Sequence, residues 1–149
     1  MQQLVSIQMK EANMNVLFDS NVIIDAITQR EESNVGAKQL YLKAAAKEIN
    51  GYLVSKQISD IAYVLRKYLD KDTIKSFCQF LCKAFIVLPF TKEDIEEAVL
   101  LNGKDFEDDI LIYIAKSNNI EFIATNNISD YSKSSVKVLK PDDILTRLK

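Results

Sequence analysis

The sequence predicts an α/β fold, a three-layer α/β/α sandwich around a central, mostly parallel sheet of four or five strands. Short apolar runs alternate with amphipathic helical segments along the whole chain, which is typical of a parallel sheet covered on both faces. With 149 residues, 48% of them hydrophobic, the chain is long enough to bury one full core. Carboxylates follow several of the apolar runs, where α/β folds place their ligands.

In the first part of the chain we expect strands at residues 16–18, 52–54 and 85–88. Helices are expected at 22–28, through 38–48, through 58–65 and from about 72 to 84. Ser33 or Asn34 would cap the second helix, and Asn50-Gly51 would end it. Ser55 would cap the third helix, and Asp72 or Thr73 would open the fourth.

The carboxyl-terminal part continues the alternation. Thr91 and Asp94 form an acidic variant of the capping box, which predicts a helix that ends near Asn102-Gly103. A strongly amphipathic helix is expected at 106–117, strands at 122–124 and 136–139, and a last short helix that begins at Pro141. We expect residues 14–149 to form a single domain, with residues 1–13 as an N-terminal extension outside the core.

Composition excludes several classes of chemistry. The chain contains no His, which removes His-based zinc sites, Ser-His-Asp triads and Cys-His nucleophiles. Cys78 and Cys82 lie four residues apart among apolar neighbours, so we expect two reduced cysteines in the core of a cytoplasmic protein. No apolar run approaches the ~20 residues that span a bilayer, and no signal peptide is recognisable. The net charge of -2 does not indicate a general nucleic-acid binder, so RNA contact would need a local basic face.

Acidic residues follow the predicted strands at four junctions. Asp19 follows the first strand, Asp60 lies one turn into the helix after the second, and Asp105, Asp108 and Asp109 open the amphipathic helix. Asp130 comes six residues after the fourth predicted strand. Because the carboxyl ends of parallel strands share one edge of the sheet, these groups are expected to converge. Such a cluster repels itself unless a hard cation is bound, and oxygen ligands alone favour Mg²⁺ or Mn²⁺.

Each acid taken alone has a simpler explanation. Asp19 and Asp105 are good helix N-caps, and Asp108 and Asp109 would stabilise a first helical turn through the helix dipole. Asp60 alone would be a solvated helix residue. The metal-site hypothesis therefore depends on the coincidence of acids at four junctions.

Four strings resemble the PIN-domain nucleases. They are Val16-Leu17-Phe18-Asp19-Ser20-Asn21-Val22, Ser59-Asp60-Ile61-Ala62-Tyr63-Val64-Leu65-Arg66-Lys67, Lys104-Asp105-Phe106-Glu107-Asp108-Asp109-Ile110 and Ile123-Ala124-Thr125-Asn126-Asn127-Ile128-Ser129-Asp130-Tyr131. The match runs in order from about residue 14 to the carboxyl terminus. It implies a Mg²⁺- or Mn²⁺-dependent endoribonuclease, often the toxin of a bacterial toxin-antitoxin pair similar to the VapC type.

The resemblance also implies roles for individual residues. Asp19, Asp60, Asp108 and Asp130 match the catalytic, metal-binding acids, and Asp105 is an acidic companion that also binds metal. Asn127 stands where many relatives carry the fourth acid, which is why that role goes to Asp130. Asn21, Thr125 and Asn127 would hydrogen-bond the acids or the substrate phosphate. Of the cations expected beside the acids, Lys56, Arg66, Lys67 and Lys104, the last is a candidate substrate-binding residue.

The expected partners are an RNA substrate, a cognate antitoxin and a second copy of the chain in a homodimer, with no membrane contact. Relatives use the region of helices 35–49 and 58–69 for the dimer and antitoxin contacts. The alternative is a PIN-fold RNA-binding or protein-interaction module with little or no activity, suggested by Asn127. An unrelated phosphatase or phosphate-binding protein is the third hypothesis, although no Gly-rich phosphate loop follows the first strand.

Overall fold

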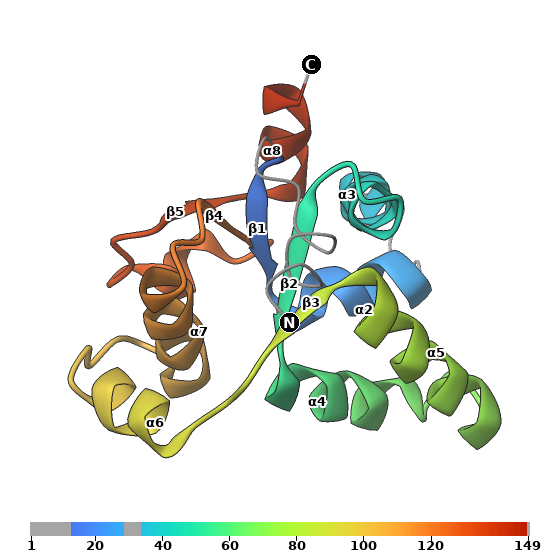
Figure 1. Ribbon diagram of the computed structural model, residues 1–149, viewed down its shortest axis with the longest axis horizontal. Helices are drawn as coiled ribbons and strands as arrows, with labels where there is room; N and C mark the ends of the chain where they lie inside the picture. The colour runs from blue at the N-terminus through green and yellow to red at the C-terminus, as the bar shows by residue number, and fades with distance from the viewer. Residues whose placement is uncertain (1–12, 29–33, 149) are drawn as a thin grey trace, which may run out of the picture.

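A computed structural model of the chain describes residues 13–28 and 34–148, and its centre is a five-stranded parallel sheet (Figure 1). The strands are β1 (Asn15–Phe18), β2 (Asn50–Val54), β3 (Ile86–Leu88), β4 (Phe122–Ala124) and β5 (Lys137–Leu139), in the order β3-β2-β1-β4-β5. All four neighbouring pairs are parallel. The predicted extension, residues 1–13, lies outside the described residues except for Asn13.

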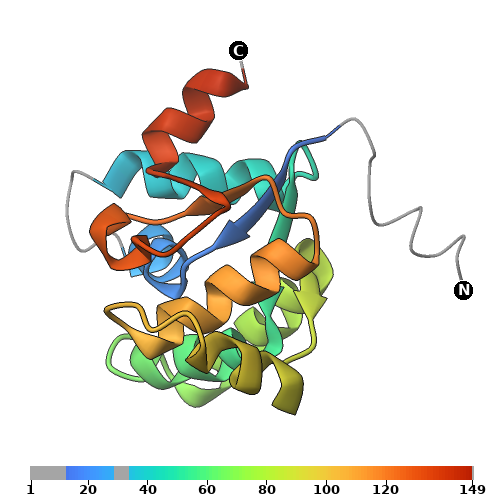
Figure 2. The same cartoon turned by 90° about the vertical axis from the view of Figure 1, so that its left-hand side faces the viewer.

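Helices connect the strands and cover both faces of the sheet, as predicted (Figure 2). They are α2 (Ser20–Thr28), α3 (Val35–Ala45), α4 (Ser55–Leu65), α5 (Lys71–Ala84), α6 (Lys92–Val99), α7 (Phe106–Ser117) and α8 (Pro141–Arg147). A short 3₁₀ helix, η2 (Ile128–Tyr131), follows β4. The three-layer α/β/α sandwich is therefore confirmed.

Alternate residues of the central strands divide the core into two clusters. Val16 and Phe18 of β1 and Leu53 of β2 pack with residues of α2, α3, α4 and α5. Leu17 and Val54 face the opposite way and pack with α6 and α7. Because successive side chains of a strand point to opposite faces, the two central strands are buried on both sides. Packing on both faces holds β1 and its neighbour β4 in place, and with them the edge of the sheet at which both strands end.

The first difference from the sequence-based prediction is the Asn50-Gly51 pair, which does not end a helix. It begins β2, and α3 ends earlier, at Ala45. Lys47 takes the left-handed conformation with φ 63°, and the N–H of Glu48 bonds the carbonyl of Lys43 at 2.9 Å. That is the backbone pattern of a Schellman helix end, here without glycine.

Helix starts also differ from the expectation. Asp70, not Asp72 or Thr73, caps α5 by accepting from the Thr73 N–H. Ser55 is the first residue of α4 and not its cap. Asn34 precedes α3 without a side-chain capping bond, and α6 ends at Val99, before Asn102-Gly103. The predicted capping box of Thr91 and Asp94 and the limits of α7 are confirmed.

The two cysteines are free, as predicted, but they do not lie in the core. Cys82 is exposed and Cys78 only partly buried. On α5, Leu81 and Ala84 face the core instead. The spacing correctly predicted one shared helix face, but that face is turned away from the sheet.

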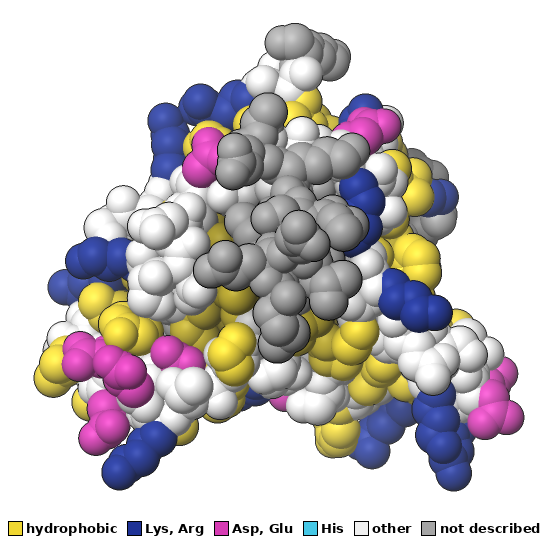
Figure 3. Space-filling model, in the orientation of Figure 1, with side chains coloured by type: hydrophobic (Ala, Val, Ile, Leu, Met, Phe, Trp, Pro, Cys, Tyr) yellow, Lys and Arg dark blue, Asp and Glu magenta, His cyan; other side chains and the backbone are white. Residues whose placement is uncertain are grey.

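Charged side chains of both signs lie at the surface. On the face seen in Figure 3, Lys and Arg side chains are spread around the outline, with hydrophobic side chains between them. None of the helices in the described ranges has the length and hydrophobicity required of a membrane span.

Candidate active site

The predicted acids line one cavity of about 400 Å³ at the carboxyl edge of the sheet. Its walls come from α2, α4, the first turn of α7 and η2. The lining residues are Asp19, Ser20, Asn21, Ile24, Val54, Lys56, Gln57, Asp60, Tyr63, Val64, Asp105, Glu107, Asp108, Ile110, Leu111, Asn127 and Asp130. Side chains from positions 19 to 130 thus converge, as expected for parallel strands.

Asp19 is the most firmly held of these acids. It directly follows β1, its N–H bonds the Ala124 carbonyl at 2.9 Å, and the residue is 8% exposed. Carboxylate oxygen Oδ2 accepts from the Thr125 hydroxyl at 2.8 Å and from the Tyr131 hydroxyl at 3.1 Å. Oδ1 accepts from the Asn21 N–H at 3.2 Å. These three hydrogen bonds hold the Asp19 carboxylate in one orientation.

The first turn of α7 gives three neighbouring carboxylates three different environments. Asp105 caps the helix and accepts from the N–H groups of Glu107 and Asp108, whereas Asp108 faces the cavity. Asp109 points the other way and is 2% exposed, with Oδ2 accepting from the Gly103 N–H at 2.8 Å. A Cβ at Gly103 would overlap that carboxylate, so the glycine permits the close approach. Asp109 therefore holds the loop before α7.

The pKa of Asp108 is raised to about 7. Burial is the largest cause, followed by the negative charges of Asp19, Asp105 and Asp130, while the Tyr131 hydroxyl opposes the rise. The pKa of Tyr131 is also raised, first by burial and then by the charges of Asp19 and Asp108. Tyr131 consequently keeps its proton and can donate to these acids.

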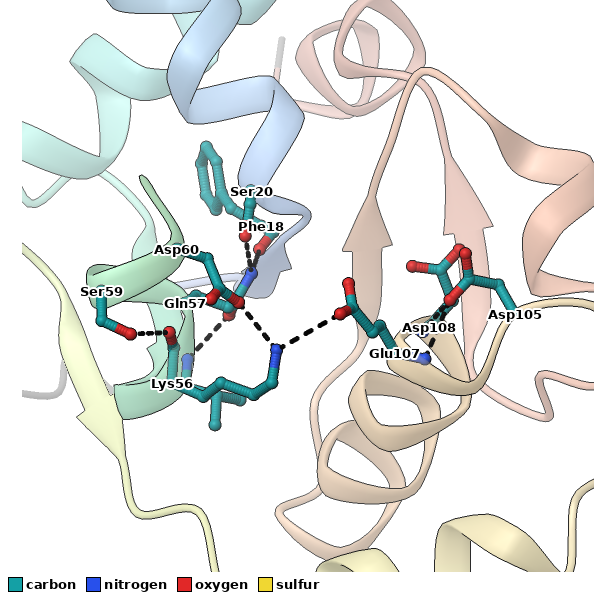
Figure 4. Close-up of polar contacts among 10 residues, drawn as sticks. Phe18, Ser20, Lys56, Gln57, Ser59, Asp60, Asp105, Glu107 and Asp108 are labelled. Atoms are coloured by element: carbon teal, nitrogen blue, oxygen red, sulfur yellow. Dashed lines mark hydrogen bonds and ion pairs between the residues drawn. The ribbon is translucent and has the colours of Figure 1, made fainter. Parts of the chain in front are cut away.

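The opposite wall is formed by α4 and carries a cation. Gln57 is buried, donates to the Phe18 carbonyl at 2.7 Å and to Ser20 Oγ at 3.1 Å, and accepts from the Val54 N–H at 2.8 Å. These bonds fix the start of α4 against the end of β1. From that start, Lys56 Nζ contacts Asp60 Oδ2 at 2.7 Å and reaches across to Glu107 Oε1 at 3.8 Å (Figure 4).

Burial lowers the pKa of Lys56, but the hydrogen bond and charge of Asp60, together with Glu107, outweigh this and leave it raised. Lys56 is thus charged at neutral pH. It compensates Asp60 in part, whereas Asp19, Asp105, Asp108 and Asp130 have no salt bridge to any described Lys or Arg.

The structure brings most of the predicted site residues together, but not all of them. Asn21 and Asn127 line the cavity, and Thr125 lies beneath it, bonded to Asp19 and to the Asn127 N–H. Lys104 is exposed and does not line the cavity, and the basic side chain found there is Lys56. Arg66, also expected near the site, stacks on the ring of Tyr63.

Two residues that organise the site were missed at the sequence level. Tyr131 is 3% exposed, and its hydroxyl donates to Asp19. The acid-aromatic pair Asp130-Tyr131 was its one visible signal. Gln57 could have been found as the third residue of a helix that follows a strand, the position from which a Gln side chain caps the helix N-terminus.

The donor set suits a divalent cation, since clustered carboxylate oxygens are the ligands that Mg²⁺ and Mn²⁺ prefer. Burial and then the charges of Asp19 and Asp105 raise the pKa of Asp108, and a bound cation would offset both. Within residues 13–28 and 34–148, however, no three Asp, Glu or Cys side chains are already arranged as metal ligands. The acids fit the ion in the chemistry of their oxygen ligands.

The chain is thus a parallel α/β/α protein with an acidic cavity at the carboxyl edge of its sheet, and the oxygen ligands of that cavity suit a divalent cation. The chain belongs to the PIN domain family, whose family model matches residues 15–129. This confirms the resemblance seen in the four sequence strings.

Individual relatives agree with this assignment. The chain is 28% identical over 137 residues to Ribonuclease VapC1 of Aquifex aeolicus (strain VF5), across 89% of this chain and 94% of that protein. FitAcB from Neisseria gonorrhoeae has a similar structure, with a TM-score of 0.64 and 16% identity over 85% of this chain and 97% of that one. A toxin-antitoxin complex from Klebsiella pneumoniae gives a TM-score of 0.63 and 21% identity, again over 85% and 97%. These two structures support the fold.

Proposed function

We propose that the protein is a metal-dependent endoribonuclease that hydrolyses RNA phosphodiester bonds, and the toxin of a bacterial type II toxin-antitoxin pair. The observation that carries the proposal is the convergence of Asp19, Asp60, Asp105, Asp108 and Asp130 on one cavity, in a PIN domain. The ribonuclease name of the Aquifex relative, which matches over nearly its whole length, supports the same activity.

Asp19, Asp60, Asp105, Asp108 and Asp130 would hold the cation, Mg²⁺ or Mn²⁺. When bound, such an ion lowers the pKa of a bound water and neutralises charge on the reacting phosphate. Thr125 and Tyr131 would keep Asp19 oriented through its Oδ2, which leaves Oδ1 the less occupied oxygen. Lys56 and Asn127, at the cavity wall, would contact phosphates on either side of the cleaved bond.

Cleavage of a mixed-sequence single-stranded RNA by the purified protein tests the activity. Wild type should cut with Mn²⁺ or Mg²⁺ and stop with EDTA, and Asp19→Asn should be inactive because the buried ligand charge is lost. A control variant, Gln79→Ala, removes an exposed amide on α5, outside the cavity, and should cut like wild type. Equal cleavage by Asp19→Asn and wild type would contradict the proposal.

We further propose a homodimer and a cognate antitoxin as partners in the cytoplasm. Large hydrophobic side chains are exposed on the helices predicted for these contacts, including Val35 and Leu42 on α3 and Tyr63 on α4. Exposed apolar groups of this size favour docking of an amphipathic segment or a second subunit. Co-expression with the product of the neighbouring small gene, followed by size measurement of the purified complex, tests both partners.

An inactive PIN-fold RNA-binding or protein-interaction module is the alternative, and two observations favour it. Asn127 supplies a neutral amide where many relatives have an acid, and the described acids are not yet arranged around one ion. Calorimetric titration with Mn²⁺ separates the two functions. RNA binding without measurable metal binding or cleavage would establish the module, whereas metal binding with cleavage would establish the nuclease.

A further inference from the structure

A second cavity, of about 600 Å³, adjoins the carboxylate cavity, and four of its ten lining residues carry side-chain amides. We call it the amide cavity. Its lining residues are Asn21, Asp25, Asn34, Gly36, Ala37, Asn126, Asn127, Lys140, Pro141 and Asp142. Asn21 and Asn127 line both cavities, so the two are continuous. A molecule bound across Asn21 and Asn127 would reach from one into the other.

The amides of this cavity are available to a ligand. In the described part of the chain, the side chains of Asn21, Asn34 and Asn127 form no hydrogen bond. Asn126 Nδ2 donates to Asp25 Oδ2 at 3.1 Å, which orients this amide and leaves its carbonyl oxygen to accept. Each side-chain amide carries a donor and an acceptor side by side.

The remaining walls suit a flat ring. Gly36 and Ala37 are small and buried at the start of α3, and Pro141 adds an apolar surface at the start of α8. A Cβ at Gly36 would overlap the carboxylate of Asp142, so the absent side chain is what lets α8 bring Asp142 to the rim. Acceptors from Asp142 and the Asn carbonyls favour a ring that carries an amino group.

We propose that the amide cavity binds one nucleobase of the RNA, next to the cleaved phosphate, and selects bases with an exocyclic amino group over uracil. This inference rests on the proposed ribonuclease function. Proteins read single-stranded RNA bases through hydrogen bonds to their edges, and Asn side chains pair with the adjacent donor and acceptor of adenine. The amide cavity also carries charges of both signs, from Asp25, Asp142 and Lys140, whereas carboxylates dominate its neighbour.

Cleavage of short RNAs, varied one position at a time, tests the inference. Wild type should cut substrates with adenine, guanine or cytosine at one position beside the cleaved bond about ten- to a hundredfold faster than substrates with uracil there, the discrimination expected of one bidentate contact. Asn34→Ala and Asn126→Ala should remove that preference in kcat/KM while cleavage of the uracil substrate stays the same. Gln79→Ala, with an exposed amide on α5, is the matched control.

Affinity measured with the Asp108→Asn variant keeps the inference separate from the proposed activity. Fluorescence anisotropy with the same RNAs should show the base preference in the absence of cleavage, and adding Asn34→Ala should abolish it. Cleavage with unchanged base preference in both amide variants would overturn the inference and leave the nuclease standing. Weakened antitoxin binding in those variants, with base preference intact, would assign the cavity to the protein partner and overturn it as well.

Discussion

The two walls of the carboxylate cavity differ in how their charges are balanced. On the wall formed by β1, β4, α7 and η2, the acids are joined by hydroxyl groups, with Tyr131 bonded to Asp19 and close enough to lower the pKa of Asp108. On the α4 wall, Lys56 pairs with Asp60. We call the first the hydroxyl wall and the second the lysine wall. Only the hydroxyl wall keeps a repulsion that an external cation would relieve.

We expect the largest loss of RNA cleavage when a negative charge is removed from the hydroxyl wall. Asp108→Asn should lower kcat/KM for RNA cleavage by about a thousandfold, since ligands of a catalytic ion support several kcal/mol of transition-state stabilisation. Asp60→Asn should cost only about tenfold, because this acid is 48% exposed and already paired with Lys56. The measurement is steady-state cleavage at saturating Mn²⁺. Equal losses in the two variants would remove the distinction between the walls.

The second effect concerns the hydroxyl that joins the acids. Tyr131→Phe should weaken Mn²⁺ binding by about ten- to a hundredfold, the usual cost of losing a group that orients a metal ligand. Isothermal titration calorimetry measures this without reference to activity. Tyr68→Phe removes an exposed hydroxyl from the α4–α5 region and should bind the ion like wild type. An unchanged Kd in Tyr131→Phe would show that Thr125 and the Asn21 N–H suffice to orient Asp19.

The third effect is a pH dependence of stability in metal-free protein. The folded-state pKa of Asp108 is about 7, above its ordinary value of 3.8, so the folded state favours the protonated form. Its contribution to stability is complete below pH 3.8 and is lost as pH rises through 7. Because Asp108 is partly exposed, solvent screening reduces this to about 1 kcal/mol, a few degrees in Tm.

Thermal unfolding in EDTA between pH 4 and pH 8 measures this dependence. Asp108→Asn should flatten the fall in Tm across this range, and Mn²⁺ should flatten it in wild type. A fall of the same size in the variant would assign it to other groups.

The parts of the site that follow from local sequence could be predicted, and the parts that depend on packing could not. Asp19 and Asp105 were placed correctly, because a strand end and a helix cap are defined by a few neighbouring residues. The bond between Tyr131 and Asp19 joins positions 112 residues apart, and no local pattern reports it. This hydrogen bond can be found only from the three-dimensional structure.

Helix orientation explains the other errors. Lys104 and Lys56 both lie near an acid in the sequence, but only Lys56 lines the cavity, because α4 presents that side chain inward. In the same way, Cys78 and Cys82 share a face of α5 that is turned from the core. Asn50-Gly51 was predicted to end a helix, but both residues are buried in β2, and packing of the sheet outweighs the local preference. The spacing of residues along a helix predicts which side chains share a face, whereas tertiary packing determines whether that face lies against the core, the cavity or solvent.

The smallest effect tests the lysine wall itself. Lys56→Met should change the free energy of unfolding by less than about 1 kcal/mol, because partly exposed ion pairs contribute little. It also releases Asp60 to join the acids across the cavity. Asp60→Asn should then cost more activity in the Lys56→Met background than alone, and the double-mutant cycle gives this coupling directly. Additive effects would show that Lys56 does not restrain Asp60, and the two walls would then differ only in exposure.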